Sequence, residues 1–257
     1  MNAQAQIAPA SVDAVVEALS RDANAGSPTV RQDFVRAFLA RMSQDEIESR
    51  SPEAWAAILG SMLRFMAERQ PGSAKVRVFN PGEAGDGIDS SHTLVQIVND
   101  DMPFLVDSVR MALTQFDVSL YEIAHPVFKV SRDAQGQLAA IGSGTAESLM
   151  YVEIDRQADD ALMHRIEGTI LNALADVRAC VRDWAQMRER MAAIAEELST
   201  RTMPAPAEVR AEAQAFLRWA ADNHFTFLGY REYDVVRKGG SELLCADEST
   251  GLGLLRG

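Results

Sequence analysis

The sequence has little cysteine, and its histidines form no pattern. Its 257 residues include two cysteines, Cys180 in a predicted helix and Cys245 in a predicted strand. Neither a CxxC pair nor a metal-ligand spacing is present, which argues against a disulfide framework and a zinc site. The four histidines fall in separate predicted elements without HxH or HExxH spacing: His92, His125, His164 and His224. Scattered histidines are more often structural, so we predict no metal site.

Basic charge and long apolar runs are also scarce. Lys and Arg total 25 against 37 Asp and Glu, which gives a formal net charge of −12. Because phosphate binding needs an excess of positive charge, this balance argues against nucleic acid and anionic membranes as partners. No window approaches about 18 uninterrupted apolar residues, and the opening MNAQAQIAPASV lacks the basic and apolar regions of a signal peptide. We therefore expect no membrane span and a cytoplasmic location.

Motifs for nucleotide binding and catalysis are missing as well. A dinucleotide-binding glycine loop follows a strand and opens a helix. Gly142-Ser143-Gly144 instead precedes a predicted strand, and no helix is visible after Gly251 and Gly253. No Walker-type GKS or GKT occurs, and Ser108 and Ser148 have no histidine partner in a recognisable motif. We predict no catalytic residue and no bound cofactor in this chain.

The sequence does contain enough apolar residues for folded cores, 47% with 24% charged residues. Its first part, residues 11–70, has three apolar patterns with helical spacing. Ser51 followed by Pro52 is a helix-start signal, and Pro71-Gly72 is expected to end the third helix. We predict a small helical segment over residues 1–72.

The central part reads β–α–β–β–α, from Thr93 to about Arg182. The predicted strands are Thr93–Val98, Val118–Val130 interrupted by Pro126, and Glu147–Ile154. This order is most of a ferredoxin-like unit, an antiparallel sheet with both helices on one face, so the predicted fold class is α+β. The last strand of such a unit is absent from its usual place. Either Lys75–Phe79 or Phe225–Val236 could supply it.

The longest helical pattern follows Asp160. Apolar residues recur at steps of three and four from Leu162 to Leu198, with one doubled step after Trp184. If continuous, a helix of about 40 residues would be about 60 Å long, too long for one small sheet. Its second half should therefore reach a neighbouring domain or another subunit. We predict one domain over 73–200, then a linker helix and the start of a truncated α+β domain with a β-hairpin over 201–257.

The segment VQIVNDDMPFLVDSVRMALTQF runs from a strand directly into an amphipathic helix. The free N–H groups of a first helical turn favour anionic ligands. We expect Pro103 in that first turn, with Asp100 or Asp101 as the capping acid. Leu105, Val109 and later residues at helical spacing would face the core. The alternative to a ligand site is plain helix capping and loop solvation by the two acids.

This strand, acidic turn with proline, helix and strand resemble ACT domains, the regulatory modules that bind amino acids beside metabolic enzymes. Six blocks in order also resemble the N-terminal part of the large bacterial NAD-specific glutamate dehydrogenases: VRVFNP, IVNDDMPFLVDSV, HPVFKVSRDAQGQL, ESLMYVEIDR, FLRWAADNHFTFLGYREY and GLGLLR. The resemblance implies a parent enzyme that converts L-glutamate, NAD and water to 2-oxoglutarate, ammonia and NADH. Its catalytic residues would lie beyond Gly257.

The resemblance also implies an effector site in the turn. The matching residues are Asn99, Asp100, Asp101, Met102 and Pro103. Amino-acid-binding ACT domains typically have glycine directly after the proline. This chain has Phe104 there, and a bulky side chain at that position could fill the effector pocket.

Three functions are therefore compared. The first is a non-catalytic regulatory and assembly module of a large glutamate dehydrogenase, which forms homo-oligomers and contacts other domains and subunits of the enzyme. The second is a free-standing ACT-type amino-acid sensor or dimerisation protein without an attached enzyme. The third, an enzyme complete within these residues, lacks support because no nucleophile, metal set or nucleotide loop is found.

Overall fold

The computed structural model describes residues 11–40, 42–82 and 86–256. The chain divides into two compact units, Met1–Leu174 and Ala175–Gly257. We describe each unit by itself. The domain limits expected from the sequence at residues 72 and 200 stay a prediction. None of the described helices is both long and apolar enough to cross a membrane.

The first unit begins with a helical segment. Its four helices are α1 (Val12–Ser20), α2 (Pro28–Leu39), α3 (Gln44–Glu48) and α4 (Pro52–Met66). Each follows a serine whose hydroxyl accepts a hydrogen bond from a backbone N–H in the first turn, at Ser11, Ser27, Ser43 and Ser51. The short α3 was not predicted because five residues carry too little periodicity. Helix α4 ends at Met66, before the Pro71-Gly72 pair expected to end it.

A six-stranded antiparallel sheet follows. Its strands are β1 (Lys75–Phe79), β2 (Thr93–Asp100), β3 (Leu120–Ala124), β4 (Val127–Arg132), β5 (Leu138–Ile141) and β6 (Thr145–Ile154). The order is β1-β2-β6-β4-β5, and β3 also pairs with β6. Strands β3 and β4 lie one after the other along the same edge of β6, since Pro126 separates them. The segment predicted as one interrupted strand is therefore two strands.

The sheet confirms the predicted α+β, ferredoxin-like class. Of the two candidates for the missing strand, Lys75–Phe79 fills the edge beside β2, with Val78 opposite Val95. The segment Phe225–Val236 instead supplies strand β7 (Gly229–Lys238), which pairs with β8 (Ser241–Gly253) in a separate two-stranded sheet.

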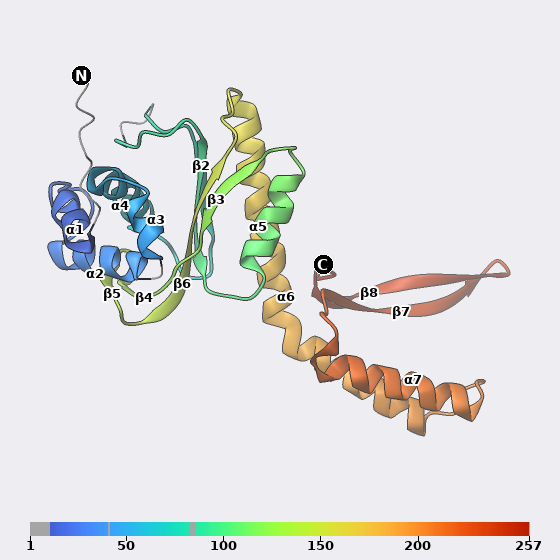
Figure 1. The fold of residues 1–257 in the computed structure, drawn as a ribbon. Helices are drawn as coiled ribbons and strands as arrows, with labels where there is room; N and C mark the ends of the chain where they lie inside the picture. Colours follow the sequence, from blue (N-terminus) through green and yellow to red (C-terminus); the bar gives the residue numbers. More distant parts are fainter. Residues whose placement is uncertain (1–10, 41, 83–85, 257) are drawn as a thin grey trace, which may run out of the picture. The chain divides into compact units, whose positions relative to one another are not determined.

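Helices cover both faces of the larger sheet. Figure 1 shows α5 (Leu105–Thr114) and the first part of α6 (Asp160–Thr200) on one side, and α1 to α4 on the other. Leu94, Val98 and Tyr151 belong to the same buried cluster as the helical segment. Their neighbours Val95 and Ile97 are equally buried and point to the opposite face. Burial on both faces explains why β2 is a nearly continuous apolar run.

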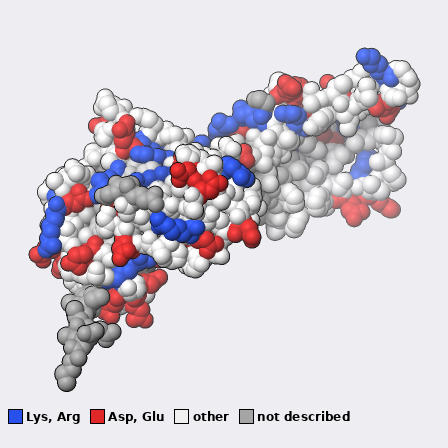
Figure 2. All heavy atoms as spheres, turned by 90° about the horizontal axis from the view of Figure 1, so that it is seen from above, with Lys and Arg blue, Asp and Glu red and all other residues white. Residues whose placement is uncertain are grey.

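The second unit contains the end of α6, then α7 (Ala207–Trp219), a kinked helical turn at Ala220–His224, and the β7–β8 hairpin. The long pattern after Asp160, whose continuity the sequence left open, forms a single helix of 41 residues. Strand β8 extends to Gly253, which pairs with Gly229 at the start of β7. Acidic and basic side chains are interspersed over the face that Figure 2 presents.

Candidate functional site

The turn between β2 and α5 is the region that the sequence indicated as an effector site. Asn99 and Asp100 are the last residues of β2, and α5 begins at Leu105. The prediction that Pro103 lies in the first turn of the helix is therefore wrong, because Pro103 precedes α5. The prediction of Asp100 or Asp101 as the capping residue is also wrong, because the N-cap is Phe104 and no side chain caps α5. The strand continues further than predicted because the Asp101 N–H donates to the Ala146 carbonyl of β6, 3.1 Å away.

Phe104 has the backbone conformation that glycine favours. Its φ of 67° lies in the left-handed region, which costs a side-chain-bearing residue about 1–2 kcal/mol. Phe104 is 55% exposed, so little apolar burial offsets that cost. The main-chain path through this turn is therefore the one that a glycine after the proline would follow.

Replacing Phe104 by glycine should raise the free energy of unfolding by about 1 kcal/mol, because the left-handed strain is removed. In a protein of this size that corresponds to a rise of about 2–4 °C in the melting temperature. Thermal unfolding followed by circular dichroism measures it. Phe104→Ala is the matched control, since it removes the ring but keeps the strained φ. Equal melting temperatures for the two variants would contradict this assignment.

Asp100 belongs to a buried ion-pair network rather than to a helix cap. Its Oδ1 accepts from Nη2 of Arg69, 2.7 Å away, and its Oδ2 accepts from the Gly72 N–H at 3.0 Å. The same Arg69 Nη2 donates to Oε1 of Glu147 at 2.6 Å. The side chains of Arg69 and Glu147 are each 1% exposed. This network joins the connection after α4 to β2 and β6.

Arg132 completes the network. It donates from Nε to Oε1 of Glu147 at 2.7 Å and from Nη2 to Oε2 at 2.8 Å, a bidentate pair. Burial alone would raise the pKa of Glu147, but the hydrogen bonds from Arg132 and Arg69 hold that pKa below its ordinary value. Glu147 is therefore a carboxylate, and its charge is matched inside the protein.

A second buried acid, Glu153, lies on the same face of β6. It accepts from Nη2 of Arg50 at 2.9 Å and from the Tyr151 hydroxyl at 2.7 Å, and His92 Nδ1 lies 2.9 Å away. Burial and the Glu153 carboxylate raise the pKa of Tyr151. The helical segment thus contributes an arginine to each inward acid, Arg50 from before α4 and Arg69 from after it.

These networks were missed by the sequence reasoning, although a signal was present. Glu147 and Glu153 occupy alternate positions of β6 together with Leu149 and Tyr151, so all four side chains point to the same face of a buried strand. Acids at the inward positions of a strand require buried cationic partners. The partner arginines lie far away in the sequence. The strand pattern therefore indicates that Glu147 and Glu153 need cationic partners but does not show which arginines these are.

His125 lies close to the turn and was treated in the sequence only as a scattered histidine. Its Nε2 is 2.5 Å from the hydroxyl of Ser148, which stands opposite Asn99 in the sheet. Burial lowers the pKa of His125, which the charge of Asp101 partly counteracts. Of the predicted effector residues, Asn99 is buried and Asp100 is held by Arg69, whereas Asp101 and Pro103 are exposed.

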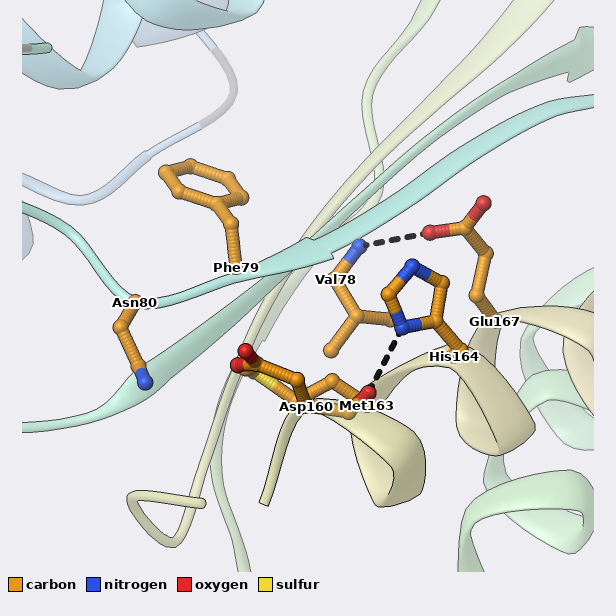
Figure 3. A pocket seen from close by; sticks show the side chains of 7 residues that line it. All are labelled: Val78, Phe79, Asn80, Asp160, Met163, His164 and Glu167. Atoms are coloured by element: carbon orange, nitrogen blue, oxygen red, sulfur yellow. Dashed lines mark hydrogen bonds between the residues drawn. The ribbon is translucent and has the colours of Figure 1, made fainter. Parts of the chain in front are cut away.

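A separate pocket of about 300 Å³ lies between β1 and the start of α6 (Figure 3). Its lining is Val78, Phe79, Asn80, Asp160, Met163, His164 and Glu167. Glu167 accepts the Val78 N–H of the edge strand at 3.3 Å, and His164 Nδ1 lies 2.7 Å from the Asp160 carbonyl. These polar groups mainly hold the helix and the strand in place. No predicted effector residue lines this pocket.

Among the residues that the structure describes, no three or more His, Cys, Asp or Glu side chains are grouped to hold a metal ion. Near the turn, Asp100, Arg69, Glu147 and Arg132 are engaged in structural contacts. The arrangement that remains available for a ligand consists of the exposed Asp101, the neighbouring His125 and the uncapped start of α5. A carboxylate, an imidazole and backbone N–H groups are the kinds of group that suit a small zwitterion. The Ser148 hydroxyl beside His125, which the sequence reasoning left without a histidine partner, is 1% exposed and so is not presented to a ligand.

A comparison with models of protein families identifies the family to which this fold belongs. Residues 34–170, slightly more than half of the chain, match the family model described as the glutamate dehydrogenase ACT1 domain. The chain belongs to this family. The match includes α4, the whole sheet, α5 and the start of α6. The resemblance inferred from the sequence is confirmed.

Relatives of this ACT1-family chain carry the name NAD-specific glutamate dehydrogenase. The Pseudomonas aeruginosa protein is 36% identical over 230 residues, and the Halomonas elongata protein is 35% identical over 233. Each alignment includes 87% of the chain but 14% of the relative. The Mycobacterium tuberculosis protein is 28% identical over 78% of the chain. The chain thus spans about one seventh of the length of the first two relatives.

Proposed function

We propose that the chain is the N-terminal, non-catalytic regulatory and assembly module of a large NAD-dependent glutamate dehydrogenase. The parent reaction would be oxidation of L-glutamate with NAD and water to 2-oxoglutarate, ammonia and NADH. The observation that carries this proposal is the ACT1 match over the six-stranded sheet, together with relatives named NAD-specific glutamate dehydrogenase. The catalytic residues and NAD would belong to the remainder of the enzyme.

The partners in this proposal are other domains and subunits of the same enzyme, in a cytoplasmic homo-oligomer. Helix α6 contributes residues to both compact units, so a displacement at its first turns can be passed along its backbone hydrogen bonds. The length of the relatives favours this function over the alternative, a free-standing ACT-type sensor without an attached enzyme.

Amino-acid sensing at the turn is the finer part of the proposal. The ligand ammonium would lie near the Asp101 carboxylate, and the ligand carboxylate would accept from N–H groups in the first turn of α5. That helix start has no side-chain cap, which supports an external acceptor there. Asp101 is preferred to Asp100 in this scheme, because the Asp100 carboxylate already accepts from Arg69 and from the Gly72 N–H.

Titration calorimetry of the chain against a panel of amino acids tests the sensing proposal. We expect one amino acid to bind, and Asp101→Asn to weaken it about tenfold, the loss of one charge-assisted contact. Glu17→Gln is the matched control, because it removes the same charge from the exposed face of α1. No heat with any amino acid would reject sensing and leave an assembly role alone.

A further inference from the structure

The second unit buries few apolar side chains. Among its described residues, the buried hydrophobic ones are Met187, Ala195, Ala220, Phe227 and Leu252. A core this small rarely stabilises a unit of such length by itself. The first unit differs sharply, because its sheet is buried on both faces.

Several large apolar side chains of the β7–β8 hairpin are exposed and so contribute nothing to this core. The exposed fractions are 50% for Tyr233, 62% for Val235 and 72% for Leu244, and Val236 and Leu243 are also exposed. Val235 stands opposite Leu244, and Tyr233 stands opposite Ala246. Because side chains alternate across a strand, Tyr233, Val235, Leu244 and Ala246 share one face of the hairpin.

Charged residues border this apolar face. Toward the turn, Arg237 and Glu242 form an ion pair at 2.8 Å. Within the described residues, β7 and β8 pair only with each other. An isolated two-stranded hairpin is at best marginally stable in water, and its apolar face calls for a second layer. An apolar centre with a polar rim is the usual composition of a surface that packs against protein.

We propose that the hairpin face Tyr233, Val235, Leu244 and Ala246 is covered by a later segment of the same, longer polypeptide. The inference rests on the proposed function, which makes the chain part of a larger enzyme. The relatives, about seven times longer than the matched region, have ample sequence for such a layer. A tethered segment is favoured over a second copy, since attachment raises its effective concentration at the hairpin.

Hydrogen exchange with mass spectrometry tests the proposal on the full-length enzyme and on the 257-residue chain. Peptides from Gly229–Gly253 report on the hairpin. We expect their amides to exchange at least about 100-fold more slowly in the full-length enzyme, at every protein concentration. In that enzyme, Leu244→Asp should speed their exchange about tenfold or more, whereas Ser241→Asp at the turn, the matched control, should not.

The outcomes separate this inference from the proposed function. Equal exchange in the two proteins, or slowing that grows with concentration and accompanies dimers of the 257-residue chain, overturns it. Peptides from residues 93–154 show whether Leu244→Asp has unfolded the protein as a whole, and Val235→Asp then serves as the second variant. A gene product no longer than the chain would reject the proposed function itself. An unprotected hairpin in a long product rejects only the inference.

Discussion

Replacing Arg69 by methionine is expected to lower the free energy of unfolding of the first unit by about 3–5 kcal/mol. Removal of one partner from a buried ion pair leaves the other charge without full compensation, which costs about that much. Here the guanidinium Nη2 serves two carboxylates at once, Glu147 at 2.6 Å and Asp100 at 2.7 Å. The Glu147 side chain is 1% exposed, so water cannot replace the lost partner. Urea unfolding followed by circular dichroism gives the difference.

Arg36→Met is the matched control for this prediction. Arg36 forms an ion pair with Asp13 at 3.3 Å, but the side chains are 55% and 86% exposed. Exposed pairs contribute about 0–1 kcal/mol, so this variant should unfold nearly as the wild type does. Comparable losses in the two variants would show that the network around Glu147 is no stronger than a surface pair.

The same network predicts a dependence on pH. Because the folded protein holds the pKa of Glu147 below its ordinary value of 4.5, this carboxylate stabilises the fold fully above pH 4.5. That contribution is lost as the pH falls through the lower, folded pKa. Urea unfolding measured at steps from pH 6 downward gives the free energy of unfolding at each pH. That free energy should fall less for Arg69→Met than for the wild type, since Glu147 in the variant has already lost one partner.

The sequence predicted four segments of the sheet from local signals, although it joined β3 and β4 into one interrupted strand and gave no bounds for β5. Strand Lys75–Phe79 and the break at Pro126 follow from nearby residues, and Pro126 separates β3 from β4 as a missing N–H should. The choice between Lys75–Phe79 and Phe225–Val236 was not local. It depends on which segment reaches the free edge of β2, and periodicity contains no such information.

The candidate site was predicted less well, for the same reason. The motif around Pro103 located the turn correctly, but the role of Asp100 depends on Arg69, which lies in the connection after α4. A capping acid and a buried ion-pair acid have the same appearance in a sequence. The left-handed φ of Phe104 could be suspected only from the glycine expected by resemblance, since no local preference of phenylalanine indicates it.

The helical segment predicted over residues 1–72 packs against the sheet of the first unit. Its side chains form one buried cluster with Leu94, Val98 and Tyr151 on the sheet. It also supplies Arg50 to the buried Glu153, while the connection after α4 supplies Arg69 to Glu147. The sheet of the first unit therefore contacts residues on both sides of the predicted limit at residue 72.

Residues 73–200, the domain predicted from the sequence, are expected not to fold alone, whereas residues 1–200 should fold. The shorter fragment exposes one sheet face, including Leu94, Val98, Phe128, Leu149 and Tyr151. At about 1.5–3 kcal/mol for each large apolar side chain, these five alone cost about 8–15 kcal/mol. That sum matches the whole stability of a typical domain, about 5–15 kcal/mol.

Thermal unfolding and the dispersion of proton NMR signals distinguish the two fragments. They share the same C-terminal end, so any difference comes from residues 1–72, and no part of the β7–β8 hairpin enters the comparison. The fragment 1–200 should show a cooperative transition, and 73–200 should show none and should associate through its uncovered apolar face. A cooperative transition of equal midpoint in both would establish residue 72 as a true domain limit. The helical segment would then be an attachment to the ACT1 fold and not its second layer.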